Sequence, residues 1–276
     1  MKRFLAIILA GLMLLTLVAC GAKDENVLKR GALEMEGEDV FSSEEHLAHM
    51  KAEGGRSSNS QENRICYNNL SSALMDLESG KIDILSLTEC MANYVVAHND
   101  KIAVNKIISG TLKSFSMMTT DSNTEVYDIL NNAIKEMKAD GTLDSLIENE
   151  LKAYINSDPE TKELPHFDGA KTIKIGVTGD LPPMDYVAAN GKAAGFNIAL
   201  LTEIANRAQV NFELVQIETG ARALALSSGK VDAVFWTKST ECTKCGATSA
   251  KSIDGVLVTE SYFTDCSASI KLKSDK

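Results

Sequence analysis

Leu77-Glu-Ser-Gly-Lys-Ile-Asp83 and Leu226-Ser-Ser-Gly-Lys-Val-Asp232 are two copies of one phrase, one in each half of the chain. In both copies an apolar helix pattern runs into Gly80 or Gly229, and an apolar run typical of a β-strand follows. Glycine readily takes the left-handed conformation just past a helix end, so each copy reads as a helix, a turn and a strand. The repeat predicts two α/β lobes of one design, and small ligands are commonly bound between such lobes.

The first half of the chain alternates between strand and helix patterns after residue 64. Apolar residues recur at helical spacing in some windows and form short uninterrupted runs in others. Before it, the segment 20–63 comprises a tether and a poorly matched stretch, of which residues 27–60 are charged and irregular. The expected elements are strands at 65–67, 82–87 and 114–119, and helices at 71–79, 89–98, 125–137 and 143–154.

Residues 156–171 have the composition of a linker, with Pro159, Pro165 and Gly169. The second half then repeats the alternation, which is typical of a parallel sheet with crossover helices. The expected elements are strands at 172–177, 212–217 and 231–237, helices at 196–208 and 221–227, and turns at 181–183 and 190–191.

The N-terminus reads as an export signal. Lys2 and Arg3 precede an uncharged stretch at 4–19, which is too short for an ordinary membrane span and fits the apolar core of a secretion signal. It ends in Leu17-Val-Ala-Cys-Gly21, which resembles a bacterial lipobox. We therefore expect a lipoprotein signal peptide at 1–19, a lipid on Cys20 and a short polar tether. A plain signal peptide with an incidental Cys20 is the alternative.

Composition limits the possible partners. The chain has a net charge of −10 at pH 7, and the signal at 1–19 holds two of its cations. An acidic chain without a basic stripe argues against nucleic acid as a partner. The remaining length suffices for one two-lobed body, and low aromatic content favours α/β layers. We expect a monomer that uses no cofactor.

Several phrases together resemble the extracellular solute-binding proteins of the polar amino-acid ABC transporter family. Residues 172–184, residues 190–197 and the second copy of the repeated phrase resemble the first lobe of that family. In the other half, residues 79–83, 92–96 and 135–143 resemble its second lobe and C-terminal helices. No single phrase is strong, but their combined spacing is fairly specific.

The resemblance implies a two-lobed α/β fold of the periplasmic-binding-protein type II (Venus-flytrap) class with its lobes in reversed order. Residues 64–155 resemble the second lobe plus the C-terminal helices, and residues 172–276 resemble the first lobe. The linker 156–171 can span roughly 50 Å, enough to join the former termini of a circularly permuted chain. Exchange of lobes between two chains is the alternative, because residues 27–63 should supply an opening strand and match nothing well.

The resemblance also implies a function. The protein would be the lipid-anchored, extracytoplasmic substrate-binding component of an ABC importer, capturing a small polar solute such as an amino acid by hinge closure. The strands at 114–119 and 267–272 would cross between the lobes. The partners would be the solute, an ABC permease that reads the closed shape, and the membrane through the lipid on Cys20.

The turn after the strand at 172–177 supplies candidate ligand-binding residues. The family places an aromatic ring before a proline here, whereas this chain has Leu181, so stacking at that position is lost. Met184 either offers an adaptable apolar wall or fills the core. Asp180 either faces a cationic group or caps the turn. Both pairs of alternatives stay open.

The stretch after the second copy of the phrase supplies further candidates. Family members place hydroxyl residues there, followed by an Arg that pairs with the ligand carboxylate. This chain offers the hydroxyls of Thr237 and Ser239 and the ring of Trp236, without that Arg. Arg222 is a candidate for binding an anion instead, and exposure at a helix start is the alternative.

The other lobe departs from the family as well. The position of the acidic ligand for an α-amino group aligns with Thr88, next to Glu89. Lys238 and Lys244 are further candidates for an anion, although Lys lacks the planar fork of Arg. These departures argue against an α-amino acid as the ligand, whereas a small polar solute is still expected.

Five cysteines remain once Cys20 is lipidated, and their odd number leaves one thiol without a partner inside the chain. A single C-x-x-C spacing with no second pair and no nearby His is weak evidence for a metal. Disulfides or free thiols are therefore favoured over a metal or redox site. These cysteines are Cys66, Cys90, Cys242, Cys245 and Cys266.

Two other functions stay open. A sensory or interaction lipoprotein would use the same cleft without a permease. Some proteins of this fold are dehydratases or lyases, and Asp180 or Glu241 would then act as acid or base without a supporting partner in the sequence. We expect no enzymatic activity.

Overall fold

The computed structural model describes residues 28–33, 64–157, 161–242, 248–249 and 254–273, and of residues 111, 236–242, 248 and 249 it describes only the backbone. The predicted signal peptide, the lipidation site Cys20 and Cys245 lie outside the described residues. No helix in the described part of the chain is long and apolar enough to cross a membrane.

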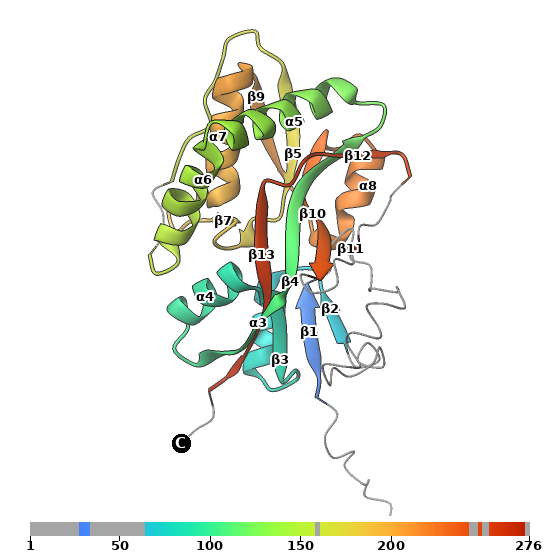
Figure 1. Ribbon diagram of the computed structural model, residues 1–276. Coiled ribbons are helices and arrows are strands. Elements are labelled where there is room, and N and C mark those ends of the chain that lie inside the picture. Colours follow the sequence, from blue (N-terminus) through green and yellow to red (C-terminus); the bar gives the residue numbers. More distant parts are fainter. Residues whose placement is uncertain (1–27, 34–63, 158–160, 243–247, 250–253, 274–276) are drawn as a thin grey trace, which may run out of the picture.

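Two lobes lie one above the other and are joined by long strands that run through both (Figure 1). The lower lobe contains β1 (Arg30–Leu33), β2 (Arg64–Tyr67), β3 (Ile84–Thr88), α3 (Leu70–Glu78) and α4 (Glu89–His98). The upper lobe contains β5 (Thr172–Val177), β9 (Asn211–Gln216), β10 (Ala233–Cys242), β11 (Thr248–Ser249), β12 (Val256–Val258), α5 (Thr124–Ala139), α6 (Thr142–Leu146), α7 (Phe196–Ala208) and α8 (Arg222–Ser227). The connecting strands are β4 (Ile102–Thr120) and β13 (Phe263–Leu272).

The two lobes share one sheet topology. Along the sheet the lower lobe has the order β2-β1-β3-β13-β4, and the upper lobe has the order β9-β5-β10-β4-β12. In each lobe the first three strands are parallel, and the long connecting strand pairs antiparallel beside them. The predicted architecture of two α/β lobes of one design is therefore present, and β4 and β13 include the segments predicted to cross between them.

The glycines of the repeated phrase end their helices as predicted. Gly80 follows α3 with φ 74°, and Gly229 follows α8 with φ 70°. Both lie in the left-handed region, where a side chain is disfavoured. The backbone N–H of each glycine donates to the last leucine of its helix, Leu77 (3.1 Å) or Leu226 (3.0 Å). The two copies therefore end their helices in the same way.

The aspartates of the phrase have a structural role that is the same in both lobes. Asp83 Oδ2 accepts a hydrogen bond from the backbone N–H of Lys29 (2.7 Å), and the N–H of Asp83 donates to Lys29 O (2.9 Å). Asp232 makes the same two bonds with Lys174, both 2.8 Å. Each aspartate thus fixes the strand that follows it beside the first strand of its lobe.

The strand β1 lies in the segment that showed no pattern in the sequence. It pairs on both sides, with β2 and β3, and so occupies the middle of the lower sheet. A Cβ atom on Gly31 would come within 2.5 Å of Ile82, as one on Gly176 in β5 would of Ile217. The phrase Lys29-Arg-Gly31 is therefore the counterpart of Lys174-Ile-Gly176, and β1 supplies the opening strand of its lobe.

Other elements also differ from expectation. The strand β4 begins at Ile102, twelve residues before the predicted start. Much of its early part is exposed, and its apolar residues do not alternate with polar ones, so the pattern did not indicate a strand. The helix expected at 143–154 is α6 only to Leu146, after which the chain continues as a π-helix, η2 (Ile147–Leu151), and a 3₁₀ turn, η3 (Lys152–Tyr154).

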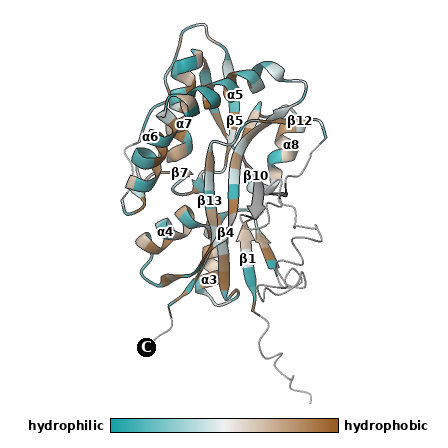
Figure 2. Ribbon diagram, viewed as in Figure 1, coloured by the Kyte–Doolittle hydropathy of each residue, from teal (hydrophilic) through white to brown (hydrophobic). Residues whose placement is uncertain are grey.

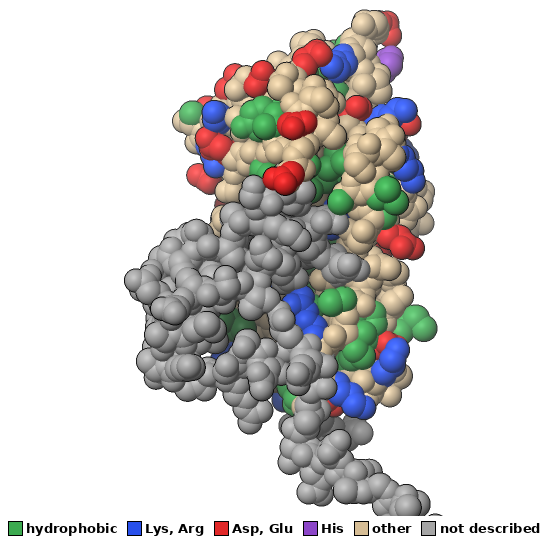
Figure 3. Space-filling model, turned by 90° about the vertical axis from the view of Figure 1, so that its right-hand side faces the viewer, with side chains coloured by type: hydrophobic (Ala, Val, Ile, Leu, Met, Phe, Trp, Pro, Cys, Tyr) green, Lys and Arg blue, Asp and Glu red, His purple; other side chains and the backbone are tan. Residues whose placement is uncertain are grey.

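Apolar side chains fill the space between the sheet and its helices. One large cluster draws on both lobes, and a smaller one under α8 contains Met118, Ile217, Leu226 and Val234. Figure 2 shows hydrophobic residues along the central strands and hydrophilic ones on the outer faces of α5 and α6. On the face shown in Figure 3, acidic side chains lie among basic ones over the upper lobe, a mixture typical of a solvated surface.

The two halves of the chain are interlocked. The helices α5 and α6 belong to the first half but cover the upper lobe, whose strands belong mostly to the second half (Figure 1). Arg207 on α7 pairs with Asp140 after α5 (2.8 Å), and Lys138 pairs with Glu260 (3.0 Å). Exposed pairs of this kind contribute little energy, so apolar packing between α5 and α7 carries the association.

We predict that replacing Gly229 by alanine lowers the free energy of unfolding by about 1 kcal/mol, because a left-handed residue with a Cβ is disfavoured by roughly that amount. No atom lies within 4 Å of the added Cβ, so the cost comes from the backbone alone. Urea denaturation measures it. The control is Gly229→Asn, which adds a larger side chain that tolerates this conformation better. Equal stability of Gly229→Ala and the unchanged protein would contradict the assignment.

Candidate functional site

Asp180 joins the two lobes. It opens β6 (Asp180–Leu181), which forms a small sheet of the upper lobe with β7 (Asp185–Val187) and β8 (Ala193–Ala194). Its Oδ2 accepts hydrogen bonds from the backbone N–H groups of Leu70 (2.9 Å) and Ser71 (3.4 Å). These are the first two amides of α3 in the lower lobe, where a carboxylate is favoured by the helix dipole.

The lower lobe supplies a hydrogen-bond acceptor for only some of the amides at the N-terminus of α3. Asn69, the residue before α3, accepts a hydrogen bond from the backbone N–H of Ser72 (2.8 Å). The first turn of α3 contains no acidic residue. The first amides of an α-helix have no partner inside the helix, so those of Leu70 and Ser71 depend on the other lobe in this conformation.

Two further contacts join the lobes beside Asp180. The Thr219 hydroxyl and backbone N–H, between β9 and α8, both donate to Asn68 O, at 2.7 and 3.3 Å. The ring of Tyr186 on β7 lies 6.1 Å from that of Tyr94 on α4, centroid to centroid, at an angle of 54°. Hydrogen bonds and an aromatic pair therefore hold the facing surfaces together outside the connecting strands.

A buried aspartate that the sequence analysis did not select holds the loop of Asp180. Asp185 is 1 % exposed. Its Oδ1 accepts hydrogen bonds from the N–H (2.9 Å) and hydroxyl (2.7 Å) of Thr178 and from the N–H of Gly179 (2.9 Å), and its Oδ2 accepts one from Asn197 (2.9 Å). A buried carboxylate with four donors is well compensated, so it fixes the backbone next to Asp180.

Arg222 lies close enough to act electrostatically on Asp180. It opens α8 and is only 1 % exposed, so the alternative of an exposed position is wrong. Burial is the largest effect on the pKa of Asp180 and raises it, and the charge of Asp185 adds to the rise. The N–H groups of α3 and the Arg222 guanidinium lower the pKa, but the net value stays above the ordinary one.

The other candidates from the first turn are core residues in this conformation. Leu181 is 1 % exposed and Met184 is 0 % exposed, and both belong to the large apolar cluster. Their side chains therefore pack inside the upper lobe, and a role in ligand binding stays a prediction. The turn that carries them is built as expected, with β6 and β7 pairing across it.

Thr88 and Thr237 occupy matching places in the two lobes. Thr88 ends β3 and pairs with Ser267 of β13, while Thr237 in β10 pairs with Ser116 of β4. Thr88 is 4 % exposed, and its hydroxyl contacts the Cys90 sulfur at 3.4 Å. The backbone of β10 carries Trp236 and Ser239 along the same strand, which is all that is described of these candidates.

The described cysteines are free thiols. Cys66 is exposed, Cys266 is half-buried, and Cys90 is buried at the start of α4, where its backbone N–H donates to Asp265 (2.9 Å). Burial, the largest effect, raises the pKa of the Cys90 thiol well above its ordinary value. Among the described residues no group of His, Cys, Asp and Glu is arranged to hold a metal ion. Disulfides involving Cys242 or Cys245 stay a prediction.

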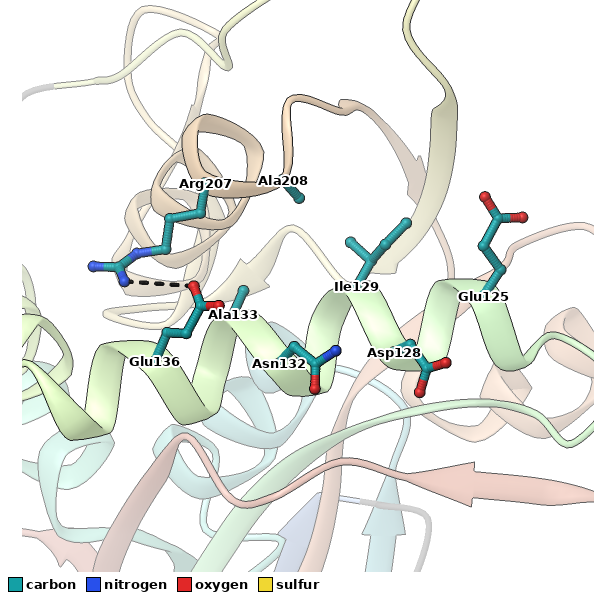
Figure 4. A pocket seen from close by; sticks show the side chains of 8 residues that line it. All are labelled: Glu125, Asp128, Ile129, Asn132, Ala133, Glu136, Arg207 and Ala208. Atoms are coloured by element: carbon teal, nitrogen blue, oxygen red, sulfur yellow. Dashed lines mark ion pairs between the residues drawn. The ribbon is translucent and has the colours of Figure 1, made fainter.

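A groove on the outside of the upper lobe lies away from these contacts. It runs between α5 and α7, has a volume of about 330 Å³, and has a floor that includes Ile129 and Ala133 (Figure 4). Arg207 at its edge pairs with Glu136 (3.8 Å), as the figure marks, and more closely with Asp140 and Glu203. The groove lies between two packed helices of one lobe and not between the lobes. The contacts between the lobes are therefore kept as the candidate site.

We predict that Asp180 makes the protein less stable as pH rises. A carboxyl whose folded-state pKa is raised binds its proton more tightly in the folded protein, so folding loses stability as pH rises through that pKa. Urea denaturation between acidic and neutral pH should show the unchanged protein losing stability relative to Asp180→Asn, which cannot titrate. A relative gain with rising pH would show that the pKa is lowered instead.

A comparison with curated protein sequences found no significant match. The ligand-binding component of an ABC-type import system from Staphylococcus aureus, with zinc bound, has a TM-score of 0.43 at 10% identity over 90% of this chain and 66% of that one. The GluR0 ligand-binding core from Nostoc punctiforme with L-glutamate has a TM-score of 0.37 at 8% identity, over 90% and 86%.

An ancestral arginine-binding protein bound to arginine has a TM-score of 0.37 at 13% identity, over 91% of this chain and 86% of that one. Residues 173–244 match the family model of the bacterial extracellular solute-binding proteins, family 3. This range runs through β5, α7, β9, α8 and β10, the strands and helices of the upper lobe. Over these residues the chain is therefore similar to family 3 of the bacterial extracellular solute-binding proteins, as the sequence phrases of the upper lobe predicted.

Proposed function

We propose that this protein is the lipid-anchored, extracytoplasmic substrate-binding component of an ABC importer and captures a small polar solute between its lobes. The observation that carries the proposal is the pair of strands, β4 and β13, that joins two lobes of one design around facing polar surfaces. Ligands are commonly held where two domains meet, and a ligand that contacts both lobes favours the closed form.

The pairing of β4 with β13 supports a hinge between the lobes. Leu112 pairs with Cys266, but the next residue of β13, Ser267, pairs with Ile108, so the register shifts here and β4 has three more residues than β13 between these two pairs. Extra residues on one strand bend it and weaken the ladder locally. Gly110 lies within this bulge, and no atom lies within 4 Å of where its Cβ would be. Domain closure is commonly absorbed by a few residues of this kind.

The polar groups at the interface support a polar ligand. Asp180, Arg222 and Thr219 come from the upper lobe, and the N-terminus of α3 faces them from the lower lobe. Both signs of charge and several hydrogen-bonding groups are therefore concentrated where the lobes meet. Such a set suits a small solute with polar ends better than an apolar one.

The order of the lobes supports a circularly permuted chain. The upper lobe, which contains the family match at 173–244, follows the lower lobe in the sequence. The helices α5 and α6 pack on the upper lobe, and the segment 155–171 leads directly from them into β5. We therefore propose one permuted unit, with the segment 156–171 joining the former ends of the chain.

A ligand screen tests the proposed function. The soluble form, residues 21–276, is screened by thermal shift against amino acids, organic acids and amines. A solute present at 100 times its dissociation constant stabilises the folded protein by about 2.7 kcal/mol, which raises the melting temperature. We expect at least one small polar solute to do so. Absence of any shift across all three classes would contradict solute capture.

The ring of Trp236 gives the screen a second readout. If the ring stacks on the solute, Trp236→Ala should lose the thermal response, because an apolar face within the site is removed. Trp236→Phe keeps a stacking face and should retain most of it. An undiminished response in Trp236→Ala would exclude the ring from the site.

Membrane fractionation tests the anchor. Lipid attached to the Cys20 sulfur holds the protein at a membrane surface, so Cys20→Ser should move the exported protein from the membrane to the soluble fraction. The matched control is Cys66→Ser, which changes another thiol outside the lipobox and should leave the protein with the membrane. Membrane association that survives Cys20→Ser would rule out this anchor.

A further inference from the structure

Asp180 supplies a hydrogen-bond acceptor from the upper lobe to the first turn of α3 in the lower lobe. Its carboxylate comes from the upper lobe and satisfies two amides of the lower lobe, those of Leu70 and Ser71. The remaining amide of that first turn, Ser72, is satisfied inside the lower lobe by Asn69. The N-terminus of α3 is therefore complete only while the lobes are in contact.

The carboxylate is presented on a rigid support. Gly179, the preceding residue, has φ 75° and donates its N–H to the buried Asp185. Thr178 donates twice to the same oxygen of Asp185, and Asp180 pairs with Tyr186 across the small sheet. Little conformational freedom remains to be lost when Asp180 meets α3, so the contact is preorganised.

Other groups of both lobes lie near the contact. Arg222 is buried in the upper lobe and attracts the Asp180 carboxylate, while Asp185 repels it. The Thr219 hydroxyl donates to Asn68 O immediately before α3, and the Tyr186 ring of the upper lobe lies 6.1 Å from the Tyr94 ring of the lower lobe, centroid to centroid. Opening the lobes would break the hydrogen bonds of Asp180 and Thr219 and the aromatic pair together, since these contacts bridge the two facing surfaces.

We propose that Asp180 is a latch that holds the lobes closed in the absence of solute, by occupying the N-terminus of α3 from the opposite lobe. The latch itself does not depend on the proposed function, but its effect on solute capture rests on that function. A solute that binds between the lobes would enter when the latch is open, and its apparent affinity would fall with the fraction of molecules that are open. Asp180 would thus set how readily the site is reached.

Small-angle scattering of the solute-free soluble form, residues 21–276, tests the latch. We expect the unchanged protein to scatter as the closed structure does, and Asp180→Ala to show a larger radius of gyration, because α3 loses its partner in the upper lobe. Asp180→Asn keeps an oxygen that can accept from both amides and should stay closed. Asp128→Ala removes an exposed carboxylate on α5 and should also stay closed.

Hydrogen exchange gives the residue-level readout. In Asp180→Ala the amides of Leu70 and Ser71 should exchange faster, while amides in the interior of α3 keep their protection, which shows that the helix remains folded. Thr219→Val removes the hydroxyl that donates to Asn68 and should enlarge the protein by a smaller amount. This second variant keeps the test informative if Asp180→Ala fails to fold.

Two results would overturn the latch. One is an unchanged protein that already scatters as an open form, and the other is an Asp180→Ala variant with unchanged radius and unchanged exchange at Leu70 and Ser71. Because no solute is present, these results are independent of the ligand screen. A failed screen with a working latch refutes solute capture alone, and a failed latch with a successful screen refutes only closure without solute.

Discussion

The exchange of two long strands between the lobes is the constraint on which the rest of the structure depends. The strand β13 pairs with β4 near Phe115 in the upper lobe and with β3 near Leu85 in the lower lobe, and β4 runs the opposite way to end between β10 and β12. Each lobe completes its sheet with strands that also serve the other lobe. Neither half of the chain therefore makes a complete sheet alone, and the proposed hinge motion would take place about these strands.

The repeated phrase explains why the lobes are alike and why their facing surfaces differ. Asp83 and Asp232 make the same pair of bonds at the first strand of their own lobe, so these aspartates have a structural role. The residues that we propose for function lie outside the repeat. Asp180 and Arg222 are two such residues, and both are charged groups of the upper lobe that lie where the lobes meet. A buried charge is costly unless it is paired, which favours a definite role for each of them.

The local sequence pattern predicted those helices and strands in which apolar spacing and turn residues alone indicate the structure. The bounds of α4, α7 and β5 follow the sequence residue for residue, because apolar spacing and flanking turn residues agree there. The strand β1 was missed because four residues in a charged segment carry too little pattern, although Lys29-Arg-Gly31 repeats Lys174-Ile-Gly176. Asp180 was selected from its turn, but its partner Leu70 lies 110 residues away and becomes visible only in the folded chain. The burial of Arg222 was likewise decided by tertiary packing.

Cutting the linker tests most directly whether the two halves form one interlocked body. A protease site inserted after Ser157 would let the folded protein be cleaved between α6 and β5 without touching any described strand or helix. Size-exclusion chromatography and light scattering then measure the mass of the product. We predict that both fragments elute together with the mass of one chain, because β4, β13 and the packing of α5 on α7 hold them. Separation of the fragments under native conditions would contradict the account.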